Sequence, residues 1–388
     1  MNLKSIFQTA AASVYQMRYA AARSKDLART GRKPVILFTS VSRAELGGNM
    51  LCVYDRLKER GLDGQYDIRL DLHADIASVN NMGDQFAFID AIACADIVFC
   101  DDYHPFLYLI DYSSDVRVVQ LWHAVGAFKT VGFARKRKDA ATHKRNSRAH
   151  RSYTHVIVSA ECDRPHYAKA FNLPQSRIYA TGVPRIDAIM DAAWQQRARN
   201  GFFQRYPQAK GKRVVLFSPT FRGDDVRRAS YDFSKLDLPQ LAAWCREHGS
   251  IAVLKFHPLT QNVPQIPQGL DDAIINASDV REVNDLLPAA DMLVTDYSSV
   301  IYEASLLEIP MVFYAYDLSE YEQSRGFFEP YGKFVPGPFV QSFPALLGAL
   351  GDGGSPKAVK AFKRRHFAHL DSGSTDRVIN LALNIKGE

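Results

Sequence analysis

The chain of 388 residues lacks several features that mark common protein classes. No apolar run approaches the roughly 18–20 residues that a membrane-spanning helix requires. The five cysteines are scattered, odd in number and without a CxxC pair, and no signal peptide precedes them. We therefore expect reduced, structural thiols in a cytosolic compartment.

Several enzyme motifs are missing as well. The sequence contains no HExxH, no DxD at a strand end, no GxxxxGK[ST] and no well-placed GxGxxG. These absences argue against a zinc or magnesium site, a P-loop enzyme and a dinucleotide oxidoreductase, so we expect no metal and no cofactor. Asp101-Asp102 is the segment that comes nearest to a metal-binding motif, and we interpret it as a helix or turn cap.

The composition is that of a globular protein, with 47% apolar and 23% charged residues. It excludes disorder, collagen and coiled coil, and the length favours two domains. Short apolar runs alternate with helical segments, which predicts parallel sheets with helical crossovers. The expected strands are 35–40, 66–72, 96–100, 116–121, 155–159, 178–181, 214–217, 251–256, 273–276, 292–294 and 311–314. The expected helices include 46–60, 186–206, 236–247, 283–289, 300–307 and most of 341–386.

The alternation restarts after a polar helical stretch and the basic segment 210–213, so we place a domain boundary there. The predicted fold class is α/β, with two Rossmann-like domains whose parallel sheets face a cleft. The expected parts are a basic amphipathic N-terminal helix at 1–33, an N-terminal Rossmann-like domain at 34–208 and a C-terminal one at 209–388.

The net charge of +6 is concentrated in two segments. Residues 1–33 hold seven basic residues and one acid, and residues 129–151 hold nine and one, so the remainder is net acidic. Apolar residues at helical spacing in 1–33, including Val14 and Met17, are typical of a helix lying on an anionic membrane. The alternative is a helix that packs on its own protein.

Polar residues follow several expected strands, where open parallel sheets bind ligands. His123 and His257 can act as acid–base groups, although a lone histidine is more often structural. The segment 218–222 offers Thr220 and Arg222 to an anion, or forms a plain turn. Ser298 and Ser299 open a helix, either as an anion site or as a simple N-cap.

Longer motifs resemble those of a known family, the CDP-glycerol glycerophosphotransferases of teichoic acid synthesis. The most distinctive are LWHAVGAFKTVGFARKRK at 121–138 and TDYSSVIYEASLL at 295–307. The resemblance covers roughly residues 115–340 in one order. Its other blocks are HRSYTHVIVSA at 150–160, TGVPRID at 181–187, SPTFR at 218–222, HP at 257–258, YAYDL at 314–318, RGFF at 325–328 and FVPGP at 334–338.

The resemblance implies a GT-B-type fold and a site divided between two histidines. His123 would deprotonate the acceptor hydroxyl, and His257 would contact the donor diphosphate. Thr220, Arg222, Ser298 and Ser299 would bind phosphate oxygens, and Glu303 would take the cytidine ribose. A basic face would meet the acceptor and the membrane, formed by Lys129, Arg135, Lys136, Arg137 and Lys138.

The function implied is transfer of glycerol phosphate from CDP-glycerol to an undecaprenyl-diphosphate-linked saccharide, with release of CMP. The expected protein is a primase, peripheral to the cytoplasmic face of the membrane. A ribitol-phosphate transferase or a glycerol-phosphate polymerase, for teichoic acid or capsule, is the alternative. A nucleotide-sugar glycosyltransferase and a basic adaptor are more distant readings. Few aromatics lie in 129–151, which disfavours nucleic acid as a partner.

Overall fold

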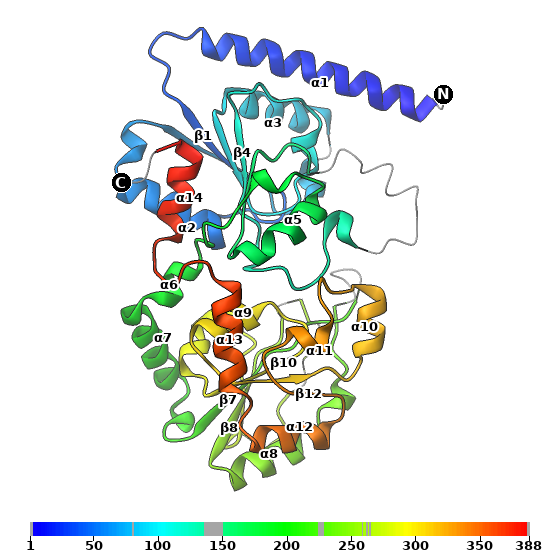
Figure 1. Ribbon diagram of the computed structural model, residues 1–388, viewed down its shortest axis with the longest axis vertical. Coiled ribbons are helices and arrows are strands. Elements are labelled where there is room, and N and C mark those ends of the chain that lie inside the picture. Colours follow the sequence, from blue (N-terminus) through cyan, green and yellow to red (C-terminus); the bar gives the residue numbers. More distant parts are fainter. Residues whose placement is uncertain are drawn as a thin grey trace. The chain divides into compact units, whose positions relative to one another are not determined.

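The computed structural model describes residues 3–79, 81–135, 150–223, 229–257, 259–260, 263 and 265–385 (Figure 1). The chain divides into two compact units. Unit 1 comprises Met1–Ala127, Val131–Asp187 and Ala368–Glu388, and unit 2 comprises Phe128–Thr130 and Ala188–Phe367. Each unit contains one six-stranded parallel sheet, which confirms the α/β class.

The sheet of unit 1 has the strand order β2-β1-β3-β4-β5-β6. The chain forms β1 and β2, then returns to the other side of β1 to add β3, so the direction of strand addition reverses between β1 and β3. All six strands lie within predicted runs. They are β1 (Val35–Ser40), β2 (Asp67–Leu72), β3 (Ile97–Cys100), β4 (Arg117–Gln120), β5 (His155–Ile157) and β6 (Ile178–Tyr179).

The sheet of unit 2 repeats this plan with the order β12-β11-β10-β7-β8-β9. Here the reversal falls between β7 and β10. The sequence analysis did not predict β12, which has only two residues. The strands are β7 (Arg213–Phe217), β8 (Ser250–Leu254), β9 (Ile274–Asn276), β10 (Met292–Thr295), β11 (Met311–Tyr314) and β12 (Phe339–Val340).

The apolar runs are continuous because parallel strands are covered on both faces. Every residue of β1 is buried, as is every residue of β8. Four helices, at residues 48–59, 238–247, 343–351 and 374–383, contribute buried residues to the two cores. Helices supply the cover on the faces of the sheets. They are α1 (Leu3–Leu27), α2 (Gly48–Glu59), α3 (Met82–Cys94), α5 (Arg164–Phe171), α6 (Ile186–Met190), α7 (Ala192–Arg205), α8 (Leu238–Glu247), α9 (Val300–Leu306), α10 (Leu318–Ser324), α11 (Tyr331–Phe334), α12 (Phe343–Gly351), α13 (Pro356–His366) and α14 (Ser374–Leu383).

The expected boundary at residues 208/209 differs from the observed boundary at residues 187/188. Helix α7 contacts the turn Leu287–Ala289, and Arg199 donates to the carbonyl of Pro288, so the stretch after Asp187 belongs to unit 2. The end of the chain also differs from expectation, because residues from Ala368 onward return to unit 1.

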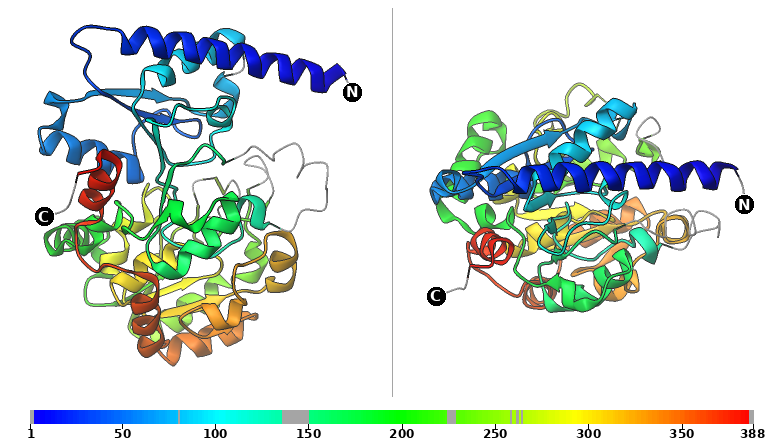
Figure 2. Two further views of the ribbon diagram at one scale, coloured as in Figure 1. Left: turned by 45° about the horizontal axis from the view of Figure 1, so that its top comes forward. Right: turned by 90° about the horizontal axis from the view of Figure 1, so that it is seen from above.

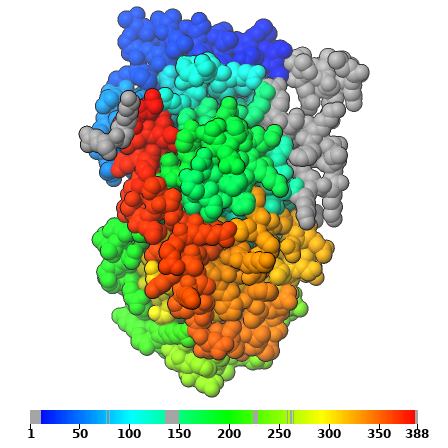
Figure 3. Space-filling model, viewed as in Figure 1, coloured from blue at the N-terminus to red at the C-terminus, as the bar shows by residue number. Residues whose placement is uncertain are grey.

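Helix α14 lies against α2 and completes the core of unit 1 (Figure 3). Val378, Ile379 and Ala382 are buried in that core. Arg56 forms a two-point contact with Asp376, with nitrogen–oxygen distances of 2.7 and 3.0 Å. In the same first turn of α14, Asp187 accepts hydrogen bonds from the backbone of Ser374 and Thr375, at 3.0 and 2.7 Å.

The basic N-terminal helix, α1, packs along α3 of its own unit (Figure 2). Tyr15 and Tyr19 are buried in this contact, while Val14 and Met17 are exposed. No helix in the described part of the chain combines the length and apolar character needed to cross a bilayer. Four of the seven basic residues in 1–33 pair with acids of unit 1: Arg18, Arg23, Arg29 and Arg32.

The helix predicted at 283–289 is wrong. The structure forms two short 3-10 turns instead, Val283–Asp285 and Leu287–Ala289. Pro288 explains the difference, because proline has no N–H and its ring clashes with the preceding helical turn.

The Asp187 cap gives a prediction about stability. Asp187→Ala removes the acceptor of two backbone N–H groups and of the Thr375 hydroxyl, at 2.7 Å. We expect the free energy of unfolding to fall by about 1–3 kcal/mol, because buried donors are left unpaired. Urea unfolding measures this loss, and the exposed Asp352→Ala is the matched control. Equal stability of the two variants would contradict the capping role.

Candidate functional site

A pocket of about 480 Å³ lies in unit 2 at the carboxyl ends of three neighbouring strands. Its walls come from the segments after β7, β8 and β10, where the strand order reverses. Open parallel sheets bind ligands at this position because the loops diverge there. Four of the residues predicted to contact the donor line it: Thr220, His257, Ser298 and Ser299.

The hydroxyl groups of this pocket are arranged to donate hydrogen bonds. Ser298 Oγ accepts from the backbone N–H of Val300 at 3.3 Å, so the hydroxyl hydrogen remains for a ligand. The Thr220 hydroxyl has no hydrogen-bond partner among the described residues, although its backbone N–H is held by Asp296 at 2.8 Å. The pocket therefore offers hydroxyl donors that suit phosphate oxygens.

His257 follows β8, and its ring lies beside Phe221, with 4.8 Å between the ring centroids. Its Nδ1 accepts a hydrogen bond from the backbone N–H of Leu259 at 3.2 Å. Burial, together with Lys255 and Lys129, lowers the pKa of His257. The imidazole is therefore neutral at pH 7, with its proton on Nε2, where it can donate to an anion. Pro258 lies outside the described residues.

Lys129 also lines this pocket, which differs from the expected acceptor-facing or membrane-facing position. The three residues Phe128–Thr130, here called the strap, belong to unit 2 although their neighbours in sequence belong to unit 1. The strap pairs with the segment 326–328: Thr130 N donates to Gly326 O at 3.1 Å, and Phe328 N donates to Phe128 O at 3.1 Å. Burial lowers the pKa of Lys129 to about 8.

Arg222 does not line the pocket, which differs from the phosphate-binding role expected for it. Its Nε and Nη2 contact Asp317 at 2.5 and 2.8 Å, and its Nη1 lies 2.9 Å from Asp296. Together Arg222, Asp296 and Asp317 form what we call the Arg222 network. Four tyrosine rings surround the guanidinium, with centroids 4.9–5.8 Å away: Tyr231, Tyr297, Tyr316 and Tyr321.

Glu303 is likewise not a wall of the pocket. It lies on α9, where every residue is buried, and it is itself 2% exposed. The structure thus does not place Glu303 where a cytidine ribose in this pocket would meet it.

His123 follows β4 in unit 1, one strand away from the point between β1 and β3 where the strand order reverses. The preceding residue, Trp122, has a φ of +52°, a left-handed conformation that is costly for a bulky side chain. Two side chains hold this turn. Asn49 donates to the carbonyls of Leu121 and Trp122, and Gln120 accepts from Trp122 N at 2.8 Å.

Acidic residues after β3 lie beside His123. The Asp102 carboxylate is 3.6 Å from His123 Nδ1. Asp101 is buried, accepts a hydrogen bond from Ser40 Oγ at 3.1 Å and pairs with Arg43 at 2.9 Å. Burial raises the pKa of Asp101. Asp102 also accepts from the backbone N–H of Tyr103, which fits the predicted turn cap.

The basic residues after the strap divide into two groups. Arg135 is exposed on unit 1. Lys136, Arg137 and Lys138 lie outside the described residues.

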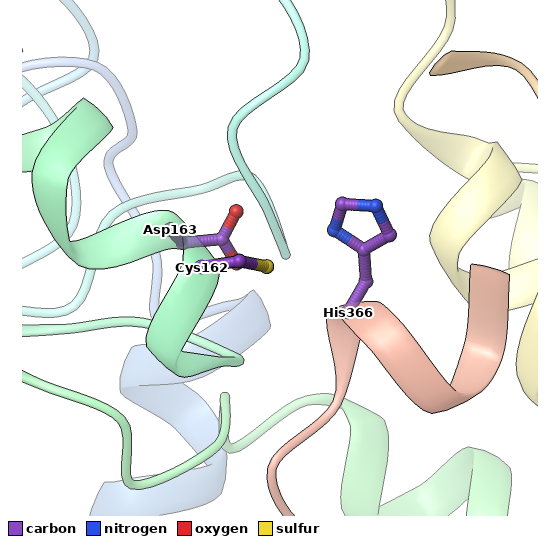
Figure 4. Close-up of side chains that lie close together, drawn as sticks. All are labelled: Cys162, Asp163 and His366. Carbon is purple, nitrogen blue, oxygen red and sulfur yellow. The ribbon is translucent and has the colours of Figure 1, made fainter. Parts of the chain in front are cut away.

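Figure 4 shows a set of potential metal ligands, Cys162, Asp163 and His366. Cys162 and Asp163 belong to unit 1 and His366 to unit 2, and we assign no metal to them. Asp163 has a contact within its own unit, because it accepts a hydrogen bond from Ala127 N at 3.1 Å.

The fold and the pocket at β7, β8 and β10 define a two-unit α/β protein whose pocket is lined by hydroxyl, imidazole and ammonium groups. The family model of CDP-Glycerol:Poly(glycerophosphate) glycerophosphotransferase matches residues 22–384. The chain belongs to this family, as the sequence motifs predicted.

Individual relatives are similar over most of this chain. The chain is 41% identical over 90% of its length to teichoic acid ribitol-phosphate polymerase TarK of Staphylococcus aureus, and covers 68% of that protein. It is 40% identical over 89% of its length to TarL of the same organism, of which it covers 61%. It is 27% identical over 74% of its length to a teichoic acid glycerol-phosphate primase of Bacillus subtilis, and covers 74% of it.

The fold resembles that of wall teichoic acid polymerase TagF. The structure of a TagF variant soaked with CDPG has a TM-score of 0.74, with 18% identity, over 99% of this chain and 98% of that one. At this identity the likeness concerns the fold.

Sequence reasoning missed the place of Lys129 in the pocket, the contact of Asp102 with His123 and the pairing of Asp317 with Arg222. Their signal was present in the motifs: YAYDL contains the partner of Arg222, and RGFF contains the backbone that pairs with the strap. A pairing between distant motifs cannot be derived from one sequence, so these residues gained a role only from the structure.

The Arg222 network gives a second prediction. Arg222→Met leaves Asp296 and Asp317 without their cation, and Asp296 is fully buried. We expect a loss of about 3–5 kcal/mol in the free energy of unfolding, as for other broken buried ion pairs. Urea unfolding of Arg222→Met and Arg222→Lys measures the effect, with the lysine variant retaining part of the stability. A methionine variant as stable as the parent would contradict a structural role.

Proposed function

We propose that this protein transfers an alditol phosphate from a CDP-activated donor to a hydroxyl of a teichoic acid acceptor, releasing CMP. The observation that carries the proposal is the pocket at β7, β8 and β10, with hydroxyl, imidazole and ammonium donors, in a chain of this family. A GT-B arrangement of the two units belongs to the same proposal.

The donor diphosphate occupies the pocket in this proposal. Ser298, Ser299 and Thr220 donate from hydroxyls, and His257 donates from Nε2. These groups stabilise charge on the phosphate oxygens as it develops. Arg222 acts indirectly, because its network fixes Thr220 N through Asp296.

His123 is the proposed base, and Asp102 orients it. A carboxylate at Nδ1 holds the imidazole in the tautomer whose Nε2 can accept a proton. The acceptor hydroxyl loses its proton to Nε2, and its oxygen forms a bond to the phosphorus that carries the alditol. The bond from that phosphorus to the bridging oxygen breaks, and CMP leaves with the electron pair.

We infer that ribitol phosphate is the favoured group. TarK and TarL, at 41% and 40% identity, are named as ribitol-phosphate polymerases, whereas the glycerol-phosphate primase of Bacillus subtilis is 27% identical. Glycerol phosphate, the group expected from the motifs, remains the alternative. A lipid-linked saccharide or a growing polymer is the acceptor in both cases.

The substrate prediction is tested by CMP release from CDP-ribitol and CDP-glycerol, in parallel, with a short-chain analogue of the lipid-linked acceptor. We expect turnover with CDP-ribitol, lower turnover with CDP-glycerol, and activity that persists in EDTA because protein groups supply the donors. Mass spectrometry of the product separates one added unit from a ladder. Release of CMP from neither donor, across several acceptors, would refute the proposal and favour a nucleotide-sugar substrate.

Site variants separate the two proposed roles. His123→Ala removes the proposed base and should lower kcat by about 10²–10⁴-fold. His257→Ala should raise the KM for the donor, and Asp102→Asn should lower kcat less than His123→Ala does. His369→Ala, at a half-buried histidine outside the pocket, is the matched control. Full activity of His123→Ala would refute its role as the base.

We further propose that the protein binds the membrane surface through α1. The exposed side chains Val14 and Met17 lie on this helix, while Tyr15 and Tyr19 face the protein. Amphipathic helices with exposed apolar residues and nearby basic residues bind anionic lipid surfaces.

Sedimentation with phosphatidylglycerol vesicles tests the membrane proposal. We expect the full chain to sediment with the vesicles, and Met17→Asp to reduce the bound fraction because a carboxylate resists insertion. Leu370→Asp, at another exposed apolar position of unit 1, is the control and should bind as the parent does. Equal binding by the parent and Met17→Asp would exclude this face.

A further inference from the structure

Lys129 lines the pocket of unit 2, although the chain on both sides of the strap belongs to unit 1. It is the middle residue of the strap, and its side chain lines the same pocket as His257, Ser298 and Ser299. We propose that Lys129 binds the diphosphate of the nucleotide donor and supplies the positive charge that a divalent cation supplies in many nucleoside-diphosphate enzymes. This inference rests on the proposed function and names a further binding residue for it.

The two residues that flank Lys129 in the strap are both anchored by contacts within unit 2. Phe128 is 3% exposed and stacks on Phe334 and Phe327, with ring centroids 4.9 and 5.2 Å apart. Thr130 Oγ1 donates to the carbonyl of Arg325 at 2.6 Å. Successive side chains of an extended segment point to opposite faces, so anchoring Phe128 and Thr130 directs Lys129 to the other face, where the pocket lies.

Close packing fixes the partner segment as well. Gly326 has a φ of +73°, and a Cβ there would lie 3.3 Å from Thr130 Oγ1. A side chain at this position would be strained and would press on the strap. The amine of Lys129 is therefore carried by a segment with little freedom to move, which lowers the entropy lost when it binds a phosphate.

The surroundings of Lys129 set its charge. The acids near it are Asp296 and Glu282, and the basic groups near it are Arg222, Arg325, Lys255, Arg281 and His257. Arg222 is already paired with two carboxylates, and Lys255 donates to the carbonyl of Phe256 at 3.0 Å. With the pKa of Lys129 lowered to about 8, the amine is mostly protonated at pH 7 and mostly neutral at pH 9.

Binding of CDP and of cytidine, measured by calorimetry on the full chain, tests the proposal without turnover. We expect Lys129→Met to weaken CDP binding about 10- to 100-fold, the range for one hydrogen bond to a charged group, and to leave cytidine binding unchanged. Lys129→Arg should retain most of the affinity for CDP. Lys357→Met, at an exposed lysine on α13 of the same unit, should match the parent.

The pH dependence provides a second measurement. CDP should bind the parent more weakly at pH 9 than at pH 7, because the amine loses its proton across that interval. Lys129→Arg should bind CDP tightly at both pH values. Lys129→Met should bind CDP weakly at both. Thermal unfolding of each variant reports whether the fold is retained.

The outcomes are distinct. If the parent binds CDP and turns over a CDP-alditol while Lys129→Met binds CDP equally well, the role of Lys129 is refuted and the proposed function stands. If the parent binds CDP no better than cytidine, both proposals are refuted. If Lys129→Met unfolds, Lys129→Arg still tests the proposal. A folded Lys129→Arg whose CDP binding weakens between pH 7 and pH 9 as much as that of the parent would refute it.

Discussion

The pocket of unit 2 depends on the ion pairs that the largely covered Arg222 guanidinium forms with Asp296 and Asp317. The guanidinium joins the segment after β7 to Asp296 after β10 and to Asp317 before α10. Asp296 in turn holds the backbone of Thr220. A buried cation with two carboxylates is costly to separate, because each charge left alone would be desolvated without compensation. The network therefore fixes the loops that carry the hydroxyl donors, although its own charges do not reach the pocket.

The family motifs divide into groups that bind and groups that hold the binding groups in place. In TGVPRID, Asp187 caps α14, and Gly182 has a φ of +82° with no room for a Cβ beside Ser374 Oγ. In RGFF, Phe327 and Gly326 support the strap. These residues of the two motifs act through packing and hydrogen bonds within unit 1 and unit 2.

Much of the fold follows from local pattern, and much of the site does not. Eleven predicted strands form at their predicted places, because fully covered parallel strands require unbroken apolar runs. His257, Ser298 and Thr220 share a pocket because strand ends converge, a general property of such sheets. Lys129 lines the pocket and Arg222 does not, since their placement depends on 326–328 and on Asp317, about 200 and 95 residues away in the sequence.

The two histidines differ in how their surroundings prepare them. His257 accepts a backbone N–H at Nδ1 and lies near Lys255 and Lys129, so it is held neutral with Nε2 as a donor. His123 has Asp102 near Nδ1, an arrangement that favours a proton on that nitrogen and leaves Nε2 as an acceptor. A donor imidazole suits a phosphate oxygen, and an acceptor imidazole suits a hydroxyl. The different roles proposed for the two histidines thus rest on the group that lies beside Nδ1 of each one.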